Sequence, residues 1–142
     1  MLKLSSQQFA FVYEGLRAAG KSGGSERREH TRMDVQARVK LATFTNHRIG
    51  RSFTGLTRDI SATGVGLFQF VPAENGVQFL ISFPADKEDL LLICTSRFCR
   101  AMAEGVFGIG AEFDAIAPPA LLEQFNAAEA STENRIRNSI LG

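Results

Sequence analysis

Six short apolar stretches separated by turn signals fill the chain between residues 35 and 113, and they constrain its fold more than any other feature. The first begins with apolar side chains at every second position, the period of a strand with one buried face: Val35, Ala37, Val39 and Leu41. The other five stretches are residues 51–60, 64–71, 76–83, 90–102 and 106–113. Short loops favour antiparallel pairing and closure protects sheet edges, so the pattern predicts a mainly β fold, a six-stranded antiparallel barrel.

A short amphipathic helix is predicted before the strands. Ser5 is suited to be its N-cap, with Gln8 three residues later in a capping box, and Leu4 can pack on Phe9 as a hydrophobic staple. The apolar side chains of this helix share one face: Phe9, Val12, Tyr13 and Leu16. Gly20 ends the helix, and the sequence GKSGGS then predicts a flexible linker.

A second helix is predicted after Pro118 and Pro119, where the period becomes helical again. Its stripe is only weakly amphipathic: Leu122, Phe125, Glu129, Thr132, Ile136 and Ile140. We therefore divide the chain into an N-terminal helix with its linker (residues 1–24), a barrel domain (25–117) and a C-terminal helix (118–142).

The charge balance requires any anion-binding site to be built locally. The chain has 16 Lys and Arg against 15 Asp and Glu, a formal net charge of +1 in 142 residues, so no overall field draws it to nucleic acid or a membrane. No segment has the continuous apolar stretch of a signal peptide or a membrane span. We therefore expect a cytoplasmic protein that does not insert into a membrane.

Residues suited to catalysis or metal binding are scarce. His30 and His47 have no acid or nucleophile at a matching spacing, so we expect neither an enzyme nor a metal site. Cys94 and Cys99 are five positions apart, which would place them on opposite faces of a regular strand, and we expect two reduced thiols. The sequence GVFGIG at residues 105–110 falls within a strand pattern, typical of turn and bulge glycines rather than of a phosphate-binding loop.

Two polar clusters point to a ligand. One is ERREHTR at residues 26–32, and the other is DISATG at residues 59–64. Arginine forks match phosphate oxygens and the O6/N7 edge of guanine, and a carboxylate can accept hydrogen bonds from guanine N1 and N2. A ligand that carries both guanines and phosphates would use both clusters. Together they offer six candidate ligand-binding residues: Arg27, Arg28, Arg32, Asp59, Ser61 and Gly64.

Each cluster also has an ordinary explanation. An arginine run is often a solvated flank or a weak nucleic-acid patch, and a DxSxxG sequence often forms a hydrogen-bonded turn at the end of a strand. The occurrence of both clusters, in this order and on this strand pattern, favours ligand binding. His30 is expected to be a spectator, and Arg48 and Arg51 are expected to be solvated loop charges.

The two clusters together resemble the motifs of the PilZ domain family, bacterial receptor modules for cyclic di-GMP. The chain has RxxxR at residues 28–32, DxSxxG at residues 59–64 and a later strand, GIGAEF, that contains glycine. The resemblance covers residues 26–114 and implies a six-stranded barrel over which the arginine segment folds when ligand binds. It implies that Arg28 and Arg32 grip guanine and phosphate beside Arg27, and that the site is completed by three further residues: Asp59, Ser61 and Gly64. Thr31 stands where relatives often have proline.

Three functions remain open. The first is a stand-alone cyclic di-GMP receptor, without other cofactors, that changes conformation and signals to an effector protein. The second is a PilZ-like interaction module without nucleotide binding, which the intact motifs disfavour. The third is a small barrel that binds single-stranded RNA or DNA; the near-zero net charge disfavours it, and we expect no nucleic-acid partner.

The N-terminal helix is the expected route of the signal. Ordering of residues 26–32 by ligand would redirect the linker and change where the helix can dock. Alternatively, the helix covers one opening of the barrel in both states.

Overall fold

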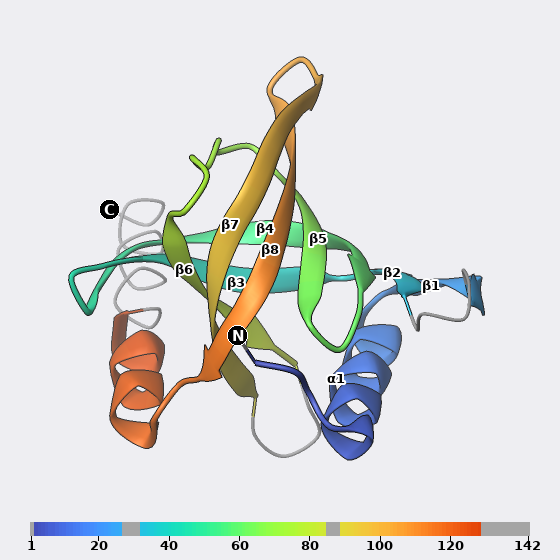
Figure 1. Cartoon of the computed structure of the whole chain (residues 1–142), viewed down its shortest axis with the longest axis horizontal. Coiled ribbons are helices and arrows are strands. Elements are labelled where there is room, and N and C mark those ends of the chain that lie inside the picture. The colour runs from blue at the N-terminus through green and yellow to red at the C-terminus, as the bar shows by residue number, and fades with distance from the viewer. Residues whose placement is uncertain (1, 27–31, 85–88, 129–142) are drawn as a thin grey trace, which may run out of the picture.

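The computed structural model describes residues 2–26, 32–84 and 89–128. Within these ranges the predicted fold class is confirmed: the chain forms a closed, six-stranded antiparallel barrel, with one helix before it and one after it in the sequence (Figure 1). Both helices lie near the lower end of the barrel in that view, whereas a long hairpin extends beyond its upper end.

The barrel is a ring of six consecutive strands. Around the ring the order is β4, β3, β6, β7, β8 and β5, and the pairing of β4 with β5 closes it. All of these pairings are antiparallel. The strands are β3 (Arg38–Thr45), β4 (Arg48–Ile60), β5 (Gly64–Gln69), β6 (Gln78–Phe83), β7 (Leu90–Ala103) and β8 (Val106–Ile116).

Two predictions about the chain before the barrel are wrong. The first predicted strand is divided in two, because β2 (Met33–Gln36) ends before Ala37 and β3 begins after it. The predicted flexible linker instead contains β1 (Lys21–Glu26), which pairs antiparallel with β2. The physical reason is that only one edge of β2 pairs with β4. The backbone donors and acceptors on its other edge need partners, and β1 supplies them.

A buried threonine hydroxyl joins β2, β3 and β4 where the first predicted strand divides. Thr57 Oγ1 donates to the Val35 carbonyl at 2.6 Å and accepts from the Ala37 N–H at 2.9 Å. The Thr57 N–H in turn donates to the Ala37 carbonyl at 2.9 Å. Backbone groups that the break removes from the regular ladder are thereby satisfied inside the protein, where water cannot reach them.

The core lies inside the ring, as the alternating pattern predicts. The four apolar side chains of the first predicted strand are at most 2% exposed: Val35, Ala37, Val39 and Leu41. They pack with inward residues of the other strands, among which Phe83 and Phe113 meet edge to face with ring centroids 6.0 Å apart.

The predicted N-terminal helix is present as α1 (Ser6–Ala19). Ser5 is its N-cap and forms the reciprocal capping box with Gln8 that the sequence predicts. Val12 and Leu16 are fully buried against the barrel core, and Leu4 is buried in the same cluster. Phe9 and Tyr13, also predicted on this face, are partly buried against that cluster. The helix therefore docks on the barrel.

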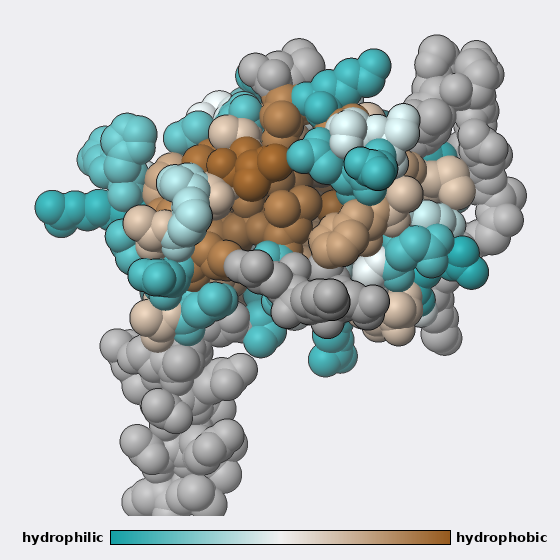
Figure 2. All heavy atoms as spheres, turned by 90° about the horizontal axis from the view of Figure 1, so that it is seen from below, coloured by the Kyte–Doolittle hydropathy of each residue, from teal (hydrophilic) through white to brown (hydrophobic). Residues whose placement is uncertain are grey.

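The C-terminal helix begins at residue 119 and is described as far as residue 128. Leu121 and Phe125, four residues apart, are buried in a second apolar cluster, whereas Leu122 is only partly buried. The other predicted members of this stripe lie outside the described residues: Glu129, Thr132, Ile136 and Ile140. Figure 2, a view of the lower end of the barrel, shows apolar side chains gathered at its centre with polar side chains around them.

The prediction that the two cysteines lie on opposite faces of a strand is wrong. Cys94 pairs with Phe113 and Cys99 with Ile109, two inward residues of β8 that are four positions apart. A bulge in β7 adds one residue between the cysteines, which returns Cys99 to the inner face. Both thiols are free, and about four residues of strand, roughly 13 Å, separate them. Burial, with a smaller effect from Asp114, raises the pKa of Cys94 well above its ordinary value.

The position of Thr57 leads to a stability prediction. Thr57→Val keeps the shape of the side chain but leaves the Ala37 N–H and the Val35 carbonyl without their shared partner. We expect a loss of about 1 to 3 kcal/mol in the free energy of unfolding, measured by urea denaturation. Thr54→Val, at an exposed position of the same strand, is the control and should change stability little. Equal stability of the two variants would show that the hydroxyl does not support the junction.

Candidate functional site

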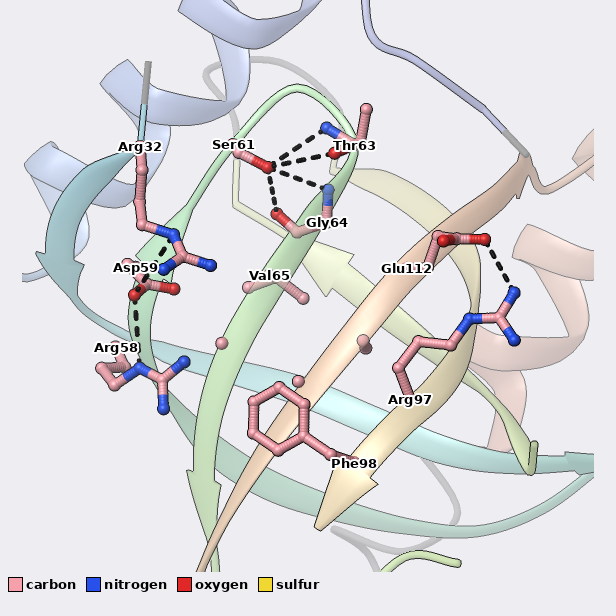
Figure 3. Close-up of a pocket in the computed structure, with 13 residues that line it drawn as sticks. Arg32, Arg58, Asp59, Ser61, Thr63, Gly64, Val65, Arg97, Phe98 and Glu112 are labelled. Atoms are coloured by element: carbon pink, nitrogen blue, oxygen red, sulfur yellow. Dashed lines mark hydrogen bonds and ion pairs between the residues drawn. The ribbon is translucent and has the colours of Figure 1, made fainter. Parts of the chain in front are cut away.

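The candidate site is a pocket of about 200 Å³ on the outer face of the barrel, beside the turn that joins β4 to β5 (Figure 3). Its floor is formed by β5 and β8, which run side by side. One wall comes from the end of β4 and from Arg32, and the opposite wall comes from β7. The pocket therefore draws on segments that are far apart in the sequence.

Four of the six predicted ligand-binding residues line this pocket: Arg32, Asp59, Ser61 and Gly64. Arg27 and Arg28 lie outside the described residues. Pairing of β2 with β4 brings the two motifs together, because Met33 is opposite Ile60 and Asp34 is opposite Asp59. Arg32, directly before β2, has its Nε 3.8 Å from Asp59 Oδ2. The Asp59 side chain is only 10% exposed, whereas that of Arg32 is 60% exposed.

Ser61 organises the turn between β4 and β5. Its hydroxyl accepts from the N–H groups of Thr63 and Gly64 at 3.3 and 3.2 Å, and its own N–H donates to the Gly64 carbonyl at 2.9 Å. This is the serine turn that is the ordinary explanation of a DxSxxG sequence. Ser61 therefore shapes the rim of the pocket through the backbone.

Gly64 has a structural reason to be glycine. A Cβ at this position would collide with the backbone carbonyl of Ala111 on β8. The nearest obstacle to a side chain here is a neighbouring strand, so the structure gives this glycine a role in the sheet. The absence of a side chain lets β5 pair closely with β8 beneath the pocket.

A β-bulge adds an arginine that the sequence interpretation missed. In the β4–β5 ladder, Thr57 is opposite Leu67 and Asp59 is opposite Gly66, so Arg58 is an extra residue. Adjacent residues of a regular strand point to opposite faces, but the bulge brings Arg58 to the pocket beside Asp59. Arg58 Nε donates to Asp59 Oδ2 at 3.3 Å.

A second bulge, on the opposite wall, brings Arg97 and Phe98 to the pocket. Ser96 is opposite Ala111 and Phe98 is opposite Gly110, so Arg97 is the extra residue. Arg97 donates to Glu112 at 2.8 Å, and this hydrogen bond, together with the charge of Glu112, raises the pKa of Arg97 above its ordinary value. Phe98 lies over Gly110, where a Cβ would collide with its ring.

The glycines of GVFGIG could have indicated this surface. Gly105 takes a positive φ of 75° in the hairpin turn, as expected of a turn glycine. Gly108 and Gly110, by contrast, lie within β8 with their missing side chains toward the outer face, and Gly110 lines the pocket. Alternating glycines in a strand mark a surface that something approaches closely. Here the approaching groups are the side chains of Met102 and Phe98.

Comparison with known proteins assigns the family. A model of the PilZ domain matches residues 26–128. The chain belongs to the PilZ domain family. No curated protein matches the chain significantly. Among solved structures, the chain is similar to the Bacillus subtilis inhibitor of motility (MotI/DgrA), with 16% identity and a TM-score of 0.48. The similarity covers 82% of this chain and 53% of that one, so this chain spans about half the length of the solved protein.

The pocket of this PilZ domain is suited to an anion with polar edges. Among the described residues that line it, three arginines and two carboxylates give a net charge of about +1: Arg32, Arg58, Arg97, Asp59 and Glu112.

The described part of the chain contains no group of three or more His, Cys, Asp or Glu side chains placed to hold a metal ion. In the same ranges, no helix combines the length and the apolar character needed to cross a membrane.

Substitution of two glycines of the PilZ pocket is expected to lower stability by different amounts. In Gly64→Ala the new methyl group meets the Ala111 backbone, which can move only if β5 and β8 separate. We expect a loss of about 1 to 3 kcal/mol in the free energy of unfolding, measured by urea denaturation. In Gly110→Ala the obstacle is the Phe98 ring, 42% exposed, which can rotate away, so the loss should be below about 1 kcal/mol. The prediction is wrong if Gly110→Ala is the more destabilising change.

Proposed function

We propose that this PilZ domain is a receptor for cyclic di-GMP that changes conformation on binding and signals to a partner protein. The observation that carries the proposal is the meeting of the two motifs in one pocket. Arg32 and Asp59, 27 positions apart, lie with Nε 3.8 Å from Oδ2 on the rim that Ser61 and Gly64 complete. Membership of the PilZ family supports the choice of ligand.

The chemistry of these side chains fits a guanine dinucleotide. Arg32 carries a largely exposed fork that matches a phosphate or the O6/N7 edge of guanine. Asp59 is nearly buried and held by two arginines, so its oxygens are positioned to accept from guanine N1 and N2. Arg27 and Arg28, which lie outside the described residues, are proposed to contribute further forks to the ligand.

The N-terminal segment provides a route for a conformational signal. The Leu4 N–H donates to the Ala62 carbonyl at 2.7 Å, inside the turn that carries Ser61 and Gly64. Leu4 directly precedes the N-cap of α1, so a movement of the turn would shift the residues at the start of the helix. This contact is a second connection between α1 and the site, besides the chain that runs from the helix to Arg32.

Two other functions are tested by the same experiments. A PilZ-like interaction module would bind a protein but no nucleotide. A barrel that binds single-stranded nucleic acid would prefer oligonucleotides and would lose affinity steeply with salt. The net charge of +1 supports neither strong nor extended contact with a polyanion.

Calorimetric titration with cyclic di-GMP tests the proposed site. We expect Arg32→Ala to weaken binding by about 2 kcal/mol, the scale of a lost charge-assisted hydrogen bond, while the barrel stays folded. Arg32→Lys should recover only part of this loss, because the planar fork is missing. Asp59→Ala should weaken binding and reduce the preference for cyclic di-GMP over cyclic di-AMP.

A control and an oligonucleotide comparison complete this titration. Arg51→Ala, in an exposed part of β4 away from the pocket, should bind as the parent does. Absence of cyclic di-GMP binding by the parent would favour the interaction module, and tighter binding of single-stranded oligonucleotides would favour the nucleic-acid barrel. If the parent binds but Arg32→Ala and Asp59→Ala are unchanged, the ligand occupies another surface.

Hydrogen exchange tests the route of the signal. We expect cyclic di-GMP to change the exchange of backbone amides in residues 59–64 and also within α1, because the Leu4–Ala62 hydrogen bond couples the two. The control is the C-terminal helix, which packs in a separate apolar cluster and should exchange equally in both states. If the turn responds and α1 does not, the helix covers the barrel in both states and the signal leaves from another surface.

A further inference from the structure

Arg58 is placed in the pocket by backbone geometry. The bulge in β4 turns it to the same face as Asp59, and Figure 3 shows its guanidinium directed toward the pocket on the same side as Arg32. Bulges commonly re-aim a side chain beside a functional site, because they break the alternation of an otherwise regular strand. The DxSxxG motif begins one residue after Arg58 and does not include it.

Gly66 leaves room for the Arg58 side chain on the floor of the pocket. A Cβ at residue 66 would come within 2.8 Å of the Arg58 Cζ, and it would also crowd Asp59. The guanidinium is further packed by Phe68, whose ring centroid is 5.9 Å from Cζ. With its side chain 29% exposed, Arg58 is more enclosed by its surroundings than Arg32, which is 60% exposed.

Asp59 is shared by two arginines. Its Oδ2 lies 3.3 Å from the Arg58 Nε and 3.8 Å from the Arg32 Nε. One carboxylate cannot neutralise two guanidinium groups, so this corner keeps a positive charge. Among the described residues, Arg58 hydrogen-bonds to Asp59 through Nε, and its two terminal nitrogens make no other hydrogen bond. The fork thus has donors left for an anion.

The arginine on the opposite wall differs in this respect. Arg97 also reaches the pocket through a bulge, but its Nη2 lies 2.8 Å from its own carboxylate partner, Glu112. Its charge is therefore matched before a ligand arrives. Of the two arginines placed by bulges, Arg58 is the one with charge and donors available.

We propose that Arg58 is a further ligand-binding residue of this pocket, whose fork donates to a phosphate of the ligand. The inference rests on the proposed function, in which Asp59 accepts from a guanine edge. The Arg58 Nε keeps its hydrogen bond to Asp59, and the two terminal nitrogens of Arg58 donate to the phosphate. In the empty pocket the same hydrogen bond holds the Asp59 carboxylate in place.

Titrations of cyclic di-GMP at several salt concentrations test this role. Arg58→Gln should weaken binding by roughly tenfold to a hundredfold, the effect of losing a hydrogen bond between charged groups. Because one contact with a charged phosphate is lost, log Kd should depend less steeply on log salt than in the parent. Arg58→Lys keeps the charge without the fork, so it should keep the slope and recover part of the affinity.

Arg51→Gln is the matched control. It removes one positive charge from an exposed position of the same strand outside the pocket, and it should change affinity by less than about twofold. Thermal unfolding of each variant shows whether the barrel is intact. If Arg58→Gln does not fold, the affinity of Arg58→Lys is compared with that of the parent instead.

The outcomes separate this inference from the proposed function. If the parent binds cyclic di-GMP and Arg58→Gln binds equally well, Arg58 makes no ligand contact. A weaker affinity with an unchanged salt slope would mean that Arg58 acts only by holding Asp59, which also overturns the phosphate contact. If the parent does not bind the dinucleotide at all, the proposed function fails and the role of Arg58 fails with it.

Discussion

The structure depends on the way β4 shares its two edges. One edge pairs with β2 near its end and with β3 over most of its length, and the other edge pairs with β5 to close the barrel. The buried hydroxyl of Thr57 holds the point where β2 gives way to β3. Because backbone groups inside a protein need partners, this junction fixes where the chain enters the barrel. Arg32, directly before β2, is thereby brought close to Asp59 on β4.

The pocket is shaped mainly by irregularities of the sheet. Two bulges bring Arg58 to one wall and Arg97 to the other. Glycines on β5 and β8 leave the floor between these walls without side chains at those positions. A regular strand would direct each of these arginines away from its neighbour on the pocket face. The candidate pocket of this PilZ domain therefore combines residues of its sequence motifs with arginines that belong to neither motif.

Several motif residues serve the fold as well as the proposed ligand. Ser61 uses its hydroxyl to stabilise the turn, and Gly64 permits the close pairing of β5 with β8. The Ala62 carbonyl in this turn accepts a hydrogen bond from the N-terminal segment, so the motif also contacts the residues that lead into α1. Binding and conformational coupling are proposed to meet in one turn of four residues. A purely structural role would account for the serine and the glycine but not for Asp59, whose carboxylate faces two arginines.

The sequence by itself determined the barrel, the capped helix and the two motifs, because these follow from local periods and local hydrogen bonds. Val35 and its alternating neighbours are buried as their period predicts, and Ser5 and Gln8 form the predicted capping box. Only the tertiary structure decided the pairing of β1 with β2, the faces of Cys99 and Arg58, and the obstacle beside Gly64. The physical reason is that a bulge is a relation between two strands. One extra residue reverses every later side chain, and nothing within a single strand records it.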